Sequence, residues 1–417
     1  IFVYIVKKEE DIMKKFNKFL SVAVASAMVM AMAGCGNTDN GSAATGTNAA
    51  TESAAASDSA ASGSVFKIGG IGPTTGGAAV YGLAVQHGAE IAVEEINAAG
   101  GINGYQVEFK FQDDEADAEK SVNAYNALKD WGAQIIDGST TSGACIAVTD
   151  KTKEDNMFQI TPSGSAVECV QYDNNFRVCF SNPNQGLASA QYIGENGLAE
   201  KIAVIYDSSD VYSSGIYEKF VKEAENQPFE VVAAEAFTAD NKTDFSVQLQ
   251  KAKDAGADMV FLPIYYQESA LILTQAAAMG YAPKWFSCDG MDGILGGVDN
   301  FDVSLTEGVM LLTPFAADAT DDLTQSFVTK YKEKYGDTPN QFAADSYDAI
   351  YVIKAAIEKS GVTPDMSVSD ICDGMKAAMT EITVDGLTGN GMTWTADGEA
   401  NKAPKAVVIE NGAYKAM

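Results

Sequence analysis

Arginine and histidine are almost absent from this sequence, which has one of each, Arg177 and His87, among 417 residues. Phosphate and nucleic-acid sites rely on the planar guanidinium group, so this scarcity argues against nucleic-acid binding. His87 lies in the middle of an expected helix with no nucleophile motif near it, and neither G-x-S-x-G nor H-E-x-x-H occurs. We therefore expect no enzyme activity.

Basic residues are also few, because Asp and Glu outnumber Lys and Arg by 57 to 28 and give a net charge of −29. Such an excess is typical of a soluble, solvated surface. Apart from the apolar run near the N-terminus, no segment reaches the roughly 18 uninterrupted apolar residues that suggest a membrane span. We expect the body of the protein not to cross a membrane.

Cysteine is present but lacks the C-x-x-C spacing of metal sites, so we expect no bound metal and no cofactor. Five cysteines lie beyond the N-terminal region: Cys145, Cys169, Cys179, Cys288 and Cys372. Cys169 and Cys179 flank a short loop and either form a disulfide in an oxidising compartment or remain buried thiols.

The N-terminal region has the pattern of an export signal. Lys14, Lys15 and Lys18 follow Met13, an apolar run extends over residues 20–33, and Gly34 precedes Cys35. The run is too short to span a bilayer. The arrangement resembles the lipobox of bacterial lipoproteins, which implies cleavage after residue 34 and acylation of Cys35; secretion with a free Cys35 is the alternative.

A small and polar segment follows this signal. Residues 36–64 consist almost entirely of Ala, Ser, Gly, Thr, Asn and Asp, a composition that predicts a flexible linker. We therefore assign residues 1–34 to the signal peptide with its upstream residues, and residues 35–64 to a lipid-anchored linker.

From Val65 onward, short apolar runs alternate with amphipathic stretches. Runs such as "VFKIGGI", "YQVEFKF" and "KIAVIY" predict strands, and the segments between them have helical periodicity. Two such series predict an α/β protein with two doubly wound, parallel-sheet lobes joined by a multi-strand hinge. We expect lobe 1 to comprise residues 65–183 and 314–391, and lobe 2 residues 184–313 and 392–417. Strand-like runs near Met392 and Val407 are expected to complete earlier sheets.

The stretch "KIGGIGPTTGGAAVYG" is a glycine cluster between an expected strand and a helix beginning near Ala79. Its glycines do not fit G-x-G-x-x-G, and no lysine follows as in a phosphate-binding loop. Nucleotide binding is therefore not indicated. A tight turn at the mouth of a ligand cleft fits better, because ligands of open α/β sheets bind beyond the carboxyl ends of the strands.

The sequence resembles the bacterial leucine/isoleucine/valine-binding proteins, which have the type I periplasmic-binding-protein fold and serve ABC importers. The resemblance begins at "IGPTTGGAAVYGLAVQHGAEIAVEEINAAGG" and continues through "IIDGSTTSGACIAV", "ITPSGSA", "KIAVIYDSSDVYSSG" and "LTGNGMTWTADGEA". It covers residues 65–414, nearly the whole expected body. It implies an extracytoplasmic protein that binds an amino acid and delivers it to an ABC permease.

The resemblance also implies which residues hold the ligand. Ser142, Ser163 and Ser165 match positions that bind the ligand's carboxylate and ammonium, although serine at a helix start also acts as a cap. Asp289 matches the acidic partner of the ammonium. The family commonly has Glu there, so the shorter Asp289 requires a deeper ligand or a bridging water.

Aromatic residues are expected to complete the pocket, since tyrosine combines an apolar ring with a polar hydroxyl. Tyr81, Tyr212 and Tyr265 resemble the family's side-chain walls and lobe-bridging phenols. Tyr266 and Phe342 fit plain core packing as well.

Taken together, these features predict a monomeric lipoprotein, anchored outside the cytoplasm through Cys35, that binds a branched-chain or other apolar amino acid for import. Three alternatives remain open at this point. The first is a receptor with the same fold that binds an amide, a urea-like compound or another small metabolite. The second is a sensory ligand-binding module, and the third is a nucleotide-using enzyme.

Overall fold

The computed structural model describes residues 63–417, which belong to one compact unit. The predicted signal peptide, Cys35 and the linker as far as residue 62 lie outside the described residues. In residues 63–417 no helix combines the length and the apolar character that crossing a membrane requires.

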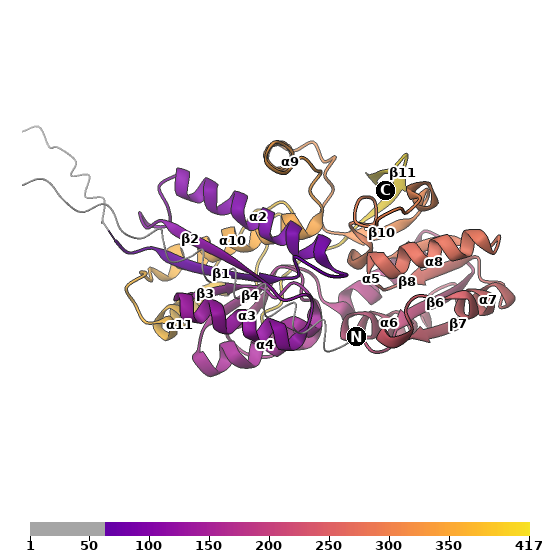
Figure 1. Cartoon of the computed structure of the whole chain (residues 1–417), viewed down its shortest axis with the longest axis horizontal. Helices are drawn as coiled ribbons and strands as arrows, with labels where there is room; N and C mark the ends of the chain where they lie inside the picture. Colours follow the sequence, from indigo (N-terminus) through magenta and orange to yellow (C-terminus); the bar gives the residue numbers. More distant parts are fainter. Residues whose placement is uncertain (1–62) are drawn as a thin grey trace, which may run out of the picture. The chain divides into compact units, whose positions relative to one another are not determined.

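The first sheet has five parallel strands within the described residues, in the spatial order β2-β1-β3-β4-β5 (Figure 1). Its strands are β1 (Phe66–Gly72), β2 (Val107–Asp113), β3 (Ile135–Asp137), β4 (Phe158–Thr161) and β5 (Asn175–Arg177). The helices packed on it are α2 (Ala79–Ala98), α3 (Ala118–Trp131), α4 (Ser142–Asp155), α10 (Gln341–Ser360) and α11 (Val368–Met379).

Helices cover both faces of this sheet, which explains why every residue of the short strand β3 is buried. Ile135 belongs to the core formed with α2 and α10, whereas its neighbour Ile136 packs with residues of α3 and α4. Successive strand residues point to opposite faces, so a strand covered on both sides reads as a continuous apolar run.

The second sheet has seven strands among the described residues, in the order β12-β11-β10-β9-β8-β6-β7 (Figure 1). They are β6 (Lys201–Asp207), β7 (Glu230–Phe237), β8 (Met259–Leu262), β9 (Lys284–Ser287), β10 (Met310–Thr313), β11 (Lys405–Glu410) and β12 (Ala413–Ala416). The helices of this region are α5 (Asn182–Glu195), α6 (Val211–Ala224), α7 (Ser246–Asp254) and α8 (Tyr266–Ala278). Helix α9 (Asp322–Tyr335) follows β10 in the chain.

The edge of the second sheet departs from the parallel pattern. β11 pairs with β10 and with β12 in antiparallel register, so this sheet is mixed. The return of the tail to an earlier sheet, expected near Val407, is confirmed. The prediction that a strand near Met392 completes a sheet was wrong, because Met392 makes only an isolated antiparallel bridge to Val384.

The chain passes between the sheets three times within the described residues: after β5, after β10, and between α11 and β11. Residues after the expected boundary at 392 still contact the first sheet. The carbonyl of Gly398 accepts from Arg177 N–H at 3.1 Å, and Trp394 Nε1 donates to Arg177 O at 2.8 Å. The lobe boundaries given above stay a prediction.

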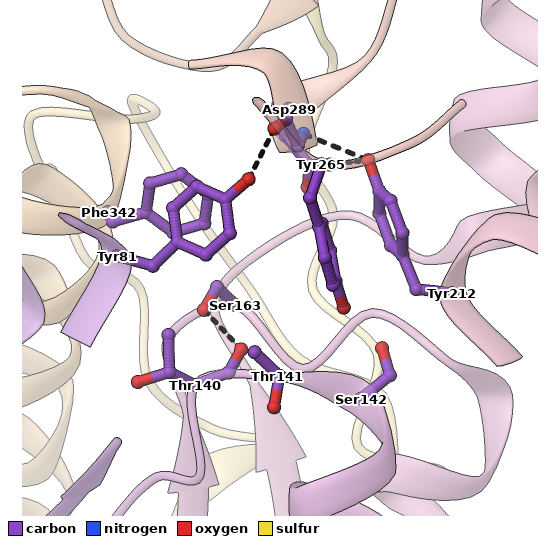
Figure 2. A pocket seen from close by; sticks show the side chains of 10 residues that line it. Tyr81, Thr140, Thr141, Ser142, Ser163, Tyr212, Tyr265, Asp289 and Phe342 are labelled. Carbon is purple, nitrogen blue, oxygen red and sulfur yellow. Dashed lines mark hydrogen bonds between the residues drawn. The ribbon is translucent and has the colours of Figure 1, made fainter. Parts of the chain in front are cut away.

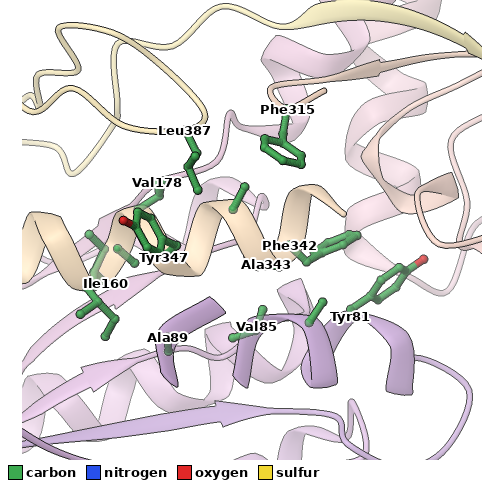
Figure 3. Packing of buried hydrophobic residues seen from close by; sticks show 14 of the residues in the cluster. Tyr81, Val85, Ala89, Ile160, Val178, Phe315, Phe342, Ala343, Tyr347 and Leu387 are labelled. Carbon is green, nitrogen blue, oxygen red and sulfur yellow. The ribbon is translucent and has the colours of Figure 1, made fainter. Parts of the chain in front are cut away.

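Two glycines of α2 allow close packing, Gly82 in the first turn of the helix and Gly88 in its middle. A Cβ on Gly88 would lie 2.0 Å from Ala343 O of α10, and Figure 3 shows Val85 and Ala89 of α2 facing α10. A Cβ on Gly82 would lie 2.0 Å from Pro73 O in the turn after β1. The glycine-rich segment is thus a tight strand-to-helix turn that fixes the position of Tyr81.

The cysteines are buried in the described part of the chain. Cys145, Cys169, Cys179, Cys288 and Cys372 are all free thiols there. The alternative of buried thiols therefore holds for Cys169 and Cys179.

Candidate functional site

A pocket lies where strand ends of the two sheets meet (Figure 2). Its lining residues follow the carboxyl ends of β1, β3 and β4 in the first sheet and of β6, β8 and β9 in the second, with one residue from α10. They are Tyr81, Thr140, Thr141, Ser142, Ser163, Tyr212, Tyr265, Asp289, Gly290 and Phe342. This is the position at which open α/β sheets bind ligands.

The first-sheet wall presents hydroxyl groups and the start of α4. Thr141 precedes the helix in extended conformation, and its Oγ1 has no hydrogen-bond partner among the described residues. Ser142 Oγ accepts from the N–H groups of Ser165 and Ala166 at 3.2 and 3.1 Å, which leaves its own proton free to donate. The first N–H groups of a helix lack intrahelical partners and form the positive end of its dipole. This wall is therefore suited to an anion.

Arg177 stabilises the loop behind that wall. Its guanidinium is fully buried and donates to the carbonyls of Gly164 and Ala166 at 3.2 and 2.8 Å. Its Nε lies 3.3 Å from Glu399 Oε2. The only arginine of the sequence therefore holds backbone in place and is absent from the pocket lining.

Asp289 dominates the second-sheet wall. It begins the short helix η3 (Asp289–Met291) directly after β9 and is 5% exposed. Its Oδ1 accepts from the Tyr212 hydroxyl at 2.6 Å and its Oδ2 from Gln185 Nε2 at 2.8 Å. Burial raises the pKa of Asp289 to about 7, although these two hydrogen bonds oppose the shift. The carboxyl group therefore changes charge near neutral pH.

Gly290 is required beside this acid. The Tyr212 hydroxyl accepts from Gly290 N–H at 2.9 Å, and a Cβ on Gly290 would lie 2.6 Å from the same oxygen. A larger residue would push the phenol away from Asp289.

Tyr81 connects the two sides of the pocket. Its hydroxyl donates to the Gly290 carbonyl and accepts from Tyr266 N–H at 3.2 Å, although Tyr81 belongs to α2 of the first sheet. Its ring centroid lies 4.3 Å from that of Phe342 and 5.5 Å from that of Tyr265. Tyr265 in turn stacks on Tyr212 at 5.0 Å. The described conformation is therefore closed, with aromatic rings packed around the pocket.

The closed pocket is small. It encloses a cavity of about 10 Å³, roughly what one water molecule needs. An amino acid therefore enters only if the two sides separate or the aromatic rings move.

Six of the seven residues predicted from the sequence line this pocket: Tyr81, Ser142, Ser163, Tyr212, Tyr265 and Asp289. Ser165 lies behind it; its N–H bonds to Ser142 Oγ, and its hydroxyl has no partner among residues 63–417. The Ser163 hydroxyl donates to Thr140 O at 2.6 Å. Contact of any of these residues with a ligand stays a prediction.

Sequence reasoning missed Thr141 and Gln185. Thr141 belongs to the hydroxyl-rich run "STTS", which was a usable signal. Gln185 is 104 residues from Asp289 in the chain, and only the fold brings them together. The described residues hold no group of three or more His, Cys, Asp or Glu side chains arranged to bind a metal ion.

Two α/β lobes with a polar and aromatic pocket between their strand ends define a small-molecule-binding protein. The family described as periplasmic binding protein matches residues 65–413, and the chain belongs to this family. The resemblance inferred from the sequence is confirmed. Membership in this family implies a location outside the cytoplasm.

Named relatives agree with this assignment. The chain is 30% identical over 300 residues to Leu/Ile/Val-binding protein homolog 3 of Brucella melitensis, covering 72% of this chain and 80% of the relative. It is also 30% identical over 302 residues to the leucine-, isoleucine-, valine-, threonine- and alanine-binding protein of Pseudomonas aeruginosa, covering 71% and 78%.

Solved structures show the same fold. The branched-chain amino acid transporter substrate-binding protein LivJ of Streptococcus pneumoniae, in complex with isoleucine, superposes with a TM-score of 0.76 at 28% identity. The superposition covers 84% of this chain and 98% of LivJ.

Proposed function

We propose that this protein captures an amino acid, branched-chain or otherwise apolar, between its two lobes and delivers it to an ABC permease. The proposal is carried by one observation: free hydroxyls and a helix start on one wall face a buried carboxyl group, Asp289, on the other. A free amino acid carries both charges. A site that dehydrates it must return hydrogen bonds to the carboxylate and a countercharge to the ammonium.

The ligand's carboxylate fits the first wall. Thr141 Oγ1 and Ser142 Oγ supply hydroxyl protons, and the N–H groups at the start of α4 supply further donors. Because Arg177 is engaged with backbone carbonyls, this recognition relies on neutral donors and the helix dipole.

The ligand's ammonium fits Asp289. When ionised, the carboxylate supplies the countercharge, and Tyr212 and Gln185 hold it in position. These partners lie on the same side as Asp289, so it is already oriented before the ligand arrives. Tyr81, Tyr265 and Phe342 then form the apolar wall for the side chain.

Closure follows from contacts to both walls. A ligand that touches both stabilises the closed form by the difference between its affinities for the two forms. In the closed form the Tyr81 hydroxyl bridges to Gly290 and Tyr266. Binding would keep this bridge or replace it with the ligand's own bonds.

The names of the relatives support an apolar side chain: leucine, isoleucine and valine in both, with threonine and alanine in one. Threonine in that list shows that such a relative accepts a polar side chain of similar size. A receptor for an amide or urea-like compound remains an alternative, because Asp289 is shorter than the Glu common in the family. A sensory module is the alternative of another class, and neighbouring permease genes would favour import.

A ligand screen on the folded mature chain tests the proposal. An amino acid present at 100 times its Kd should add about 2.7 kcal/mol to the free energy of unfolding, read as a thermal shift. L-Leucine should raise the melting temperature, whereas leucinamide, which lacks the carboxylate, and 4-methylpentanoate, which lacks the ammonium, should not. A flat response to every amino acid would contradict the proposal.

The pKa of Asp289 predicts how pH affects binding. In the closed form without a ligand, Asp289 is protonated below about pH 7 and must lose that proton to pair with an ammonium. Affinity should therefore fall about tenfold for each pH unit below 7 and become constant above it. Calorimetry in buffers of different ionisation enthalpy should detect proton release at pH 6 and little at pH 8.5. The Asp289→Asn variant should lose this dependence, and a wild-type affinity that is flat from pH 5 to 8 would contradict the ammonium pairing.

We further propose that the mature chain begins at Cys35, is anchored to the membrane by a lipid on that thiol, and acts as a monomer. The lysines and the apolar run before Cys35 support export, and the acidic, polar character of the chain supports a solvated body. A Cys35→Ala variant that still fractionates with membranes would contradict the anchor.

A further inference from the structure

A second and much larger cavity lies next to the first pocket, with a volume of about 450 Å³. It forms where the start of α2, the loop after η3, the end of β10, the start of α10 and the turn before β12 come together. Val80, Leu295, Leu311, Phe315 and Tyr414 form an apolar part of its lining, and charged and polar side chains form the rest. Phe315 lies at the same end of α10 as Phe342 (Figure 3). Its volume is that of a small-molecule site, which is roughly 300 to 1,000 Å³.

One buried acid stands out in this lining. Asp292 is 4% exposed, its Oδ2 accepts from Gln341 N–H at 2.9 Å, and its Oδ1 has no hydrogen-bond partner among the described residues. The Tyr414 hydroxyl lies beside it and accepts from Gly293 N–H at 3.3 Å. Burial raises the pKa of Asp292, and the Gln341 N–H and the neighbouring Tyr414 hydroxyl oppose this shift. A buried carboxyl oxygen without a donor is costly, and a ligand N–H would relieve that cost.

The charges around the cavity favour a cation. Three acidic side chains, Asp292, Asp318 and Asp337, line it against two lysines, Lys332 and Lys415. Lys415 already lies 3.9 Å from Asp318. The unpaired Oδ1 of Asp292 is a hydrogen-bond acceptor, and an ammonium supplies donors to it and a countercharge once the carboxyl group is ionised.

The second cavity shares a wall with the first pocket. Gln341 N–H bonds Asp292, while Gln341 Nε2 donates to Asp289 O at 2.9 Å. Val80 of the second cavity is the neighbour of Tyr81 in the first. A Cβ on Gly293 or Gly297 would lie 2.7 or 2.6 Å from the Val80 side chain, so this wall is tightly packed.

We infer that the second cavity binds a small organic ammonium ion with an apolar body, and that its occupation changes the affinity of the first pocket. The ammonium pairs with Asp292 and the apolar body contacts Phe315, Leu295 and Tyr414. Because Gln341 contacts both acids, an occupant that shifts Asp292 also shifts the backbone of Asp289.

The test uses 2-phenylethylamine as the probe and the mature chain as the protein, with calorimetry at pH 8. Wild type should bind the amine, and Asp292→Asn should weaken binding at least tenfold. Gly296→Phe should abolish binding, because Gly296 lines the cavity and a Cβ there has nothing within 4 Å, so a bulky side chain can be introduced without a clash at Cβ. The matched control is Asp240→Asn, an exposed acid outside the cavity lining, which should leave binding unchanged.

Three results would overturn the inference. The first is no binding of the amine to wild type at millimolar concentration. The second is equal binding by wild type, Asp292→Asn and Gly296→Phe. The third is loss of binding in Asp289→Asn with Asp292→Asn unaffected, which would place the amine in the first pocket.

The coupling between the second cavity and the first pocket is tested by a separate measurement. With the amine at saturation, the Kd for the amino acid selected by the thermal screen should change about fivefold or more. An unchanged Kd would overturn the coupling.

Discussion

Replacing Asp289 by alanine should weaken amino-acid binding by about 2 to 5 kcal/mol, because the ligand's ammonium would then be buried without a countercharge. The loss has a second component. The Tyr212 hydroxyl and Gln185 Nε2 would each lose the carboxylate oxygen that accepts from them at 2.6 and 2.8 Å. Calorimetry with the amino acid selected by the thermal screen measures the effect.

A pair of variants separates charge from shape. Asp289→Asn keeps an oxygen for Tyr212 but removes the charge, so it should lose most of the affinity while keeping the wild-type melting temperature within a few degrees. Asp240→Ala removes an exposed acid far from the pocket lining and should bind as wild type does. Wild-type affinity in a folded Asp289→Ala protein would remove Asp289 from the site.

The short side chain of Asp289 also bears on ligand position. Its two oxygens are held back against α5 and α6 by Gln185 and Tyr212. A carboxylate one methylene shorter than Glu therefore pairs directly only with an ammonium that lies closer to these helices, or pairs through a bridging water. An Asp289→Glu variant with improved affinity would indicate the water.

The second large effect concerns stability and arises from Asp137, the last residue of β3. Its side chain is fully buried, Ser346 Oγ donates to Oδ2 at 3.0 Å, and Oδ1 has no partner in the described part of the chain. Burial raises the pKa of Asp137 to about 7, with the Ser346 bond opposing the shift. Folding therefore favours the protonated form of this group.

Proton linkage determines whether Asp137 makes the folded protein more or less stable as the pH rises. The unfolded chain releases this proton near pH 4, whereas the folded protein keeps it until about pH 7. The contribution to stability is therefore fully present below pH 4 and is lost as pH rises through 7. Between pH 4.5 and pH 8 the wild type should lose about 3 kcal/mol from this group alone.

Asp137→Asn should remove that loss. The difference in unfolding free energy between variant and wild type should move by about 3 kcal/mol in favour of the variant from pH 4.5 to pH 8. Comparing the two pH values cancels any fixed cost of burying the amide. Urea denaturation of both proteins at the two pH values measures the difference in unfolding free energy. Asp240→Asn serves as the control at an exposed acid. A difference that is the same at both pH values would show that Asp137 titrates normally.

Long apolar strands and capped helices were predictable from the sequence because they carry their own signals. β6 and β8 read as buried runs, and α3 begins at the Asp117 cap and ends at Gly132 in left-handed conformation. The strand β5 was missed because its three residues, Asn175 to Arg177, include two polar side chains that the fold buries. α11 had a usable signal in the Ser367 cap, which accepts from Asp370 N–H.

The site was predictable to the extent that residues follow strand ends. Ser142, Tyr212 and Asp289 each lie within a few residues of the carboxyl end of an expected strand, so the parallel topology brings them to the cleft. The hydrogen bonds among them depend on tertiary distance. The local sequence does not predict the hydrogen bond from Tyr81 to Gly290 or the one from Gln185 to Asp289. The two residues of each pair lie 209 and 104 positions apart in the chain, respectively.

The buried position of Arg177 has a practical consequence for measuring the dynamics of this protein. A protease that cleaves only after arginine has a single target bond in the entire chain, and the folded protein encloses it at the edge of the first sheet. Cleavage there needs local opening of the region that supports the loop from Gly164 to Val167. The rate of that one cut therefore reports the population of molecules in which this edge has come apart, without any label.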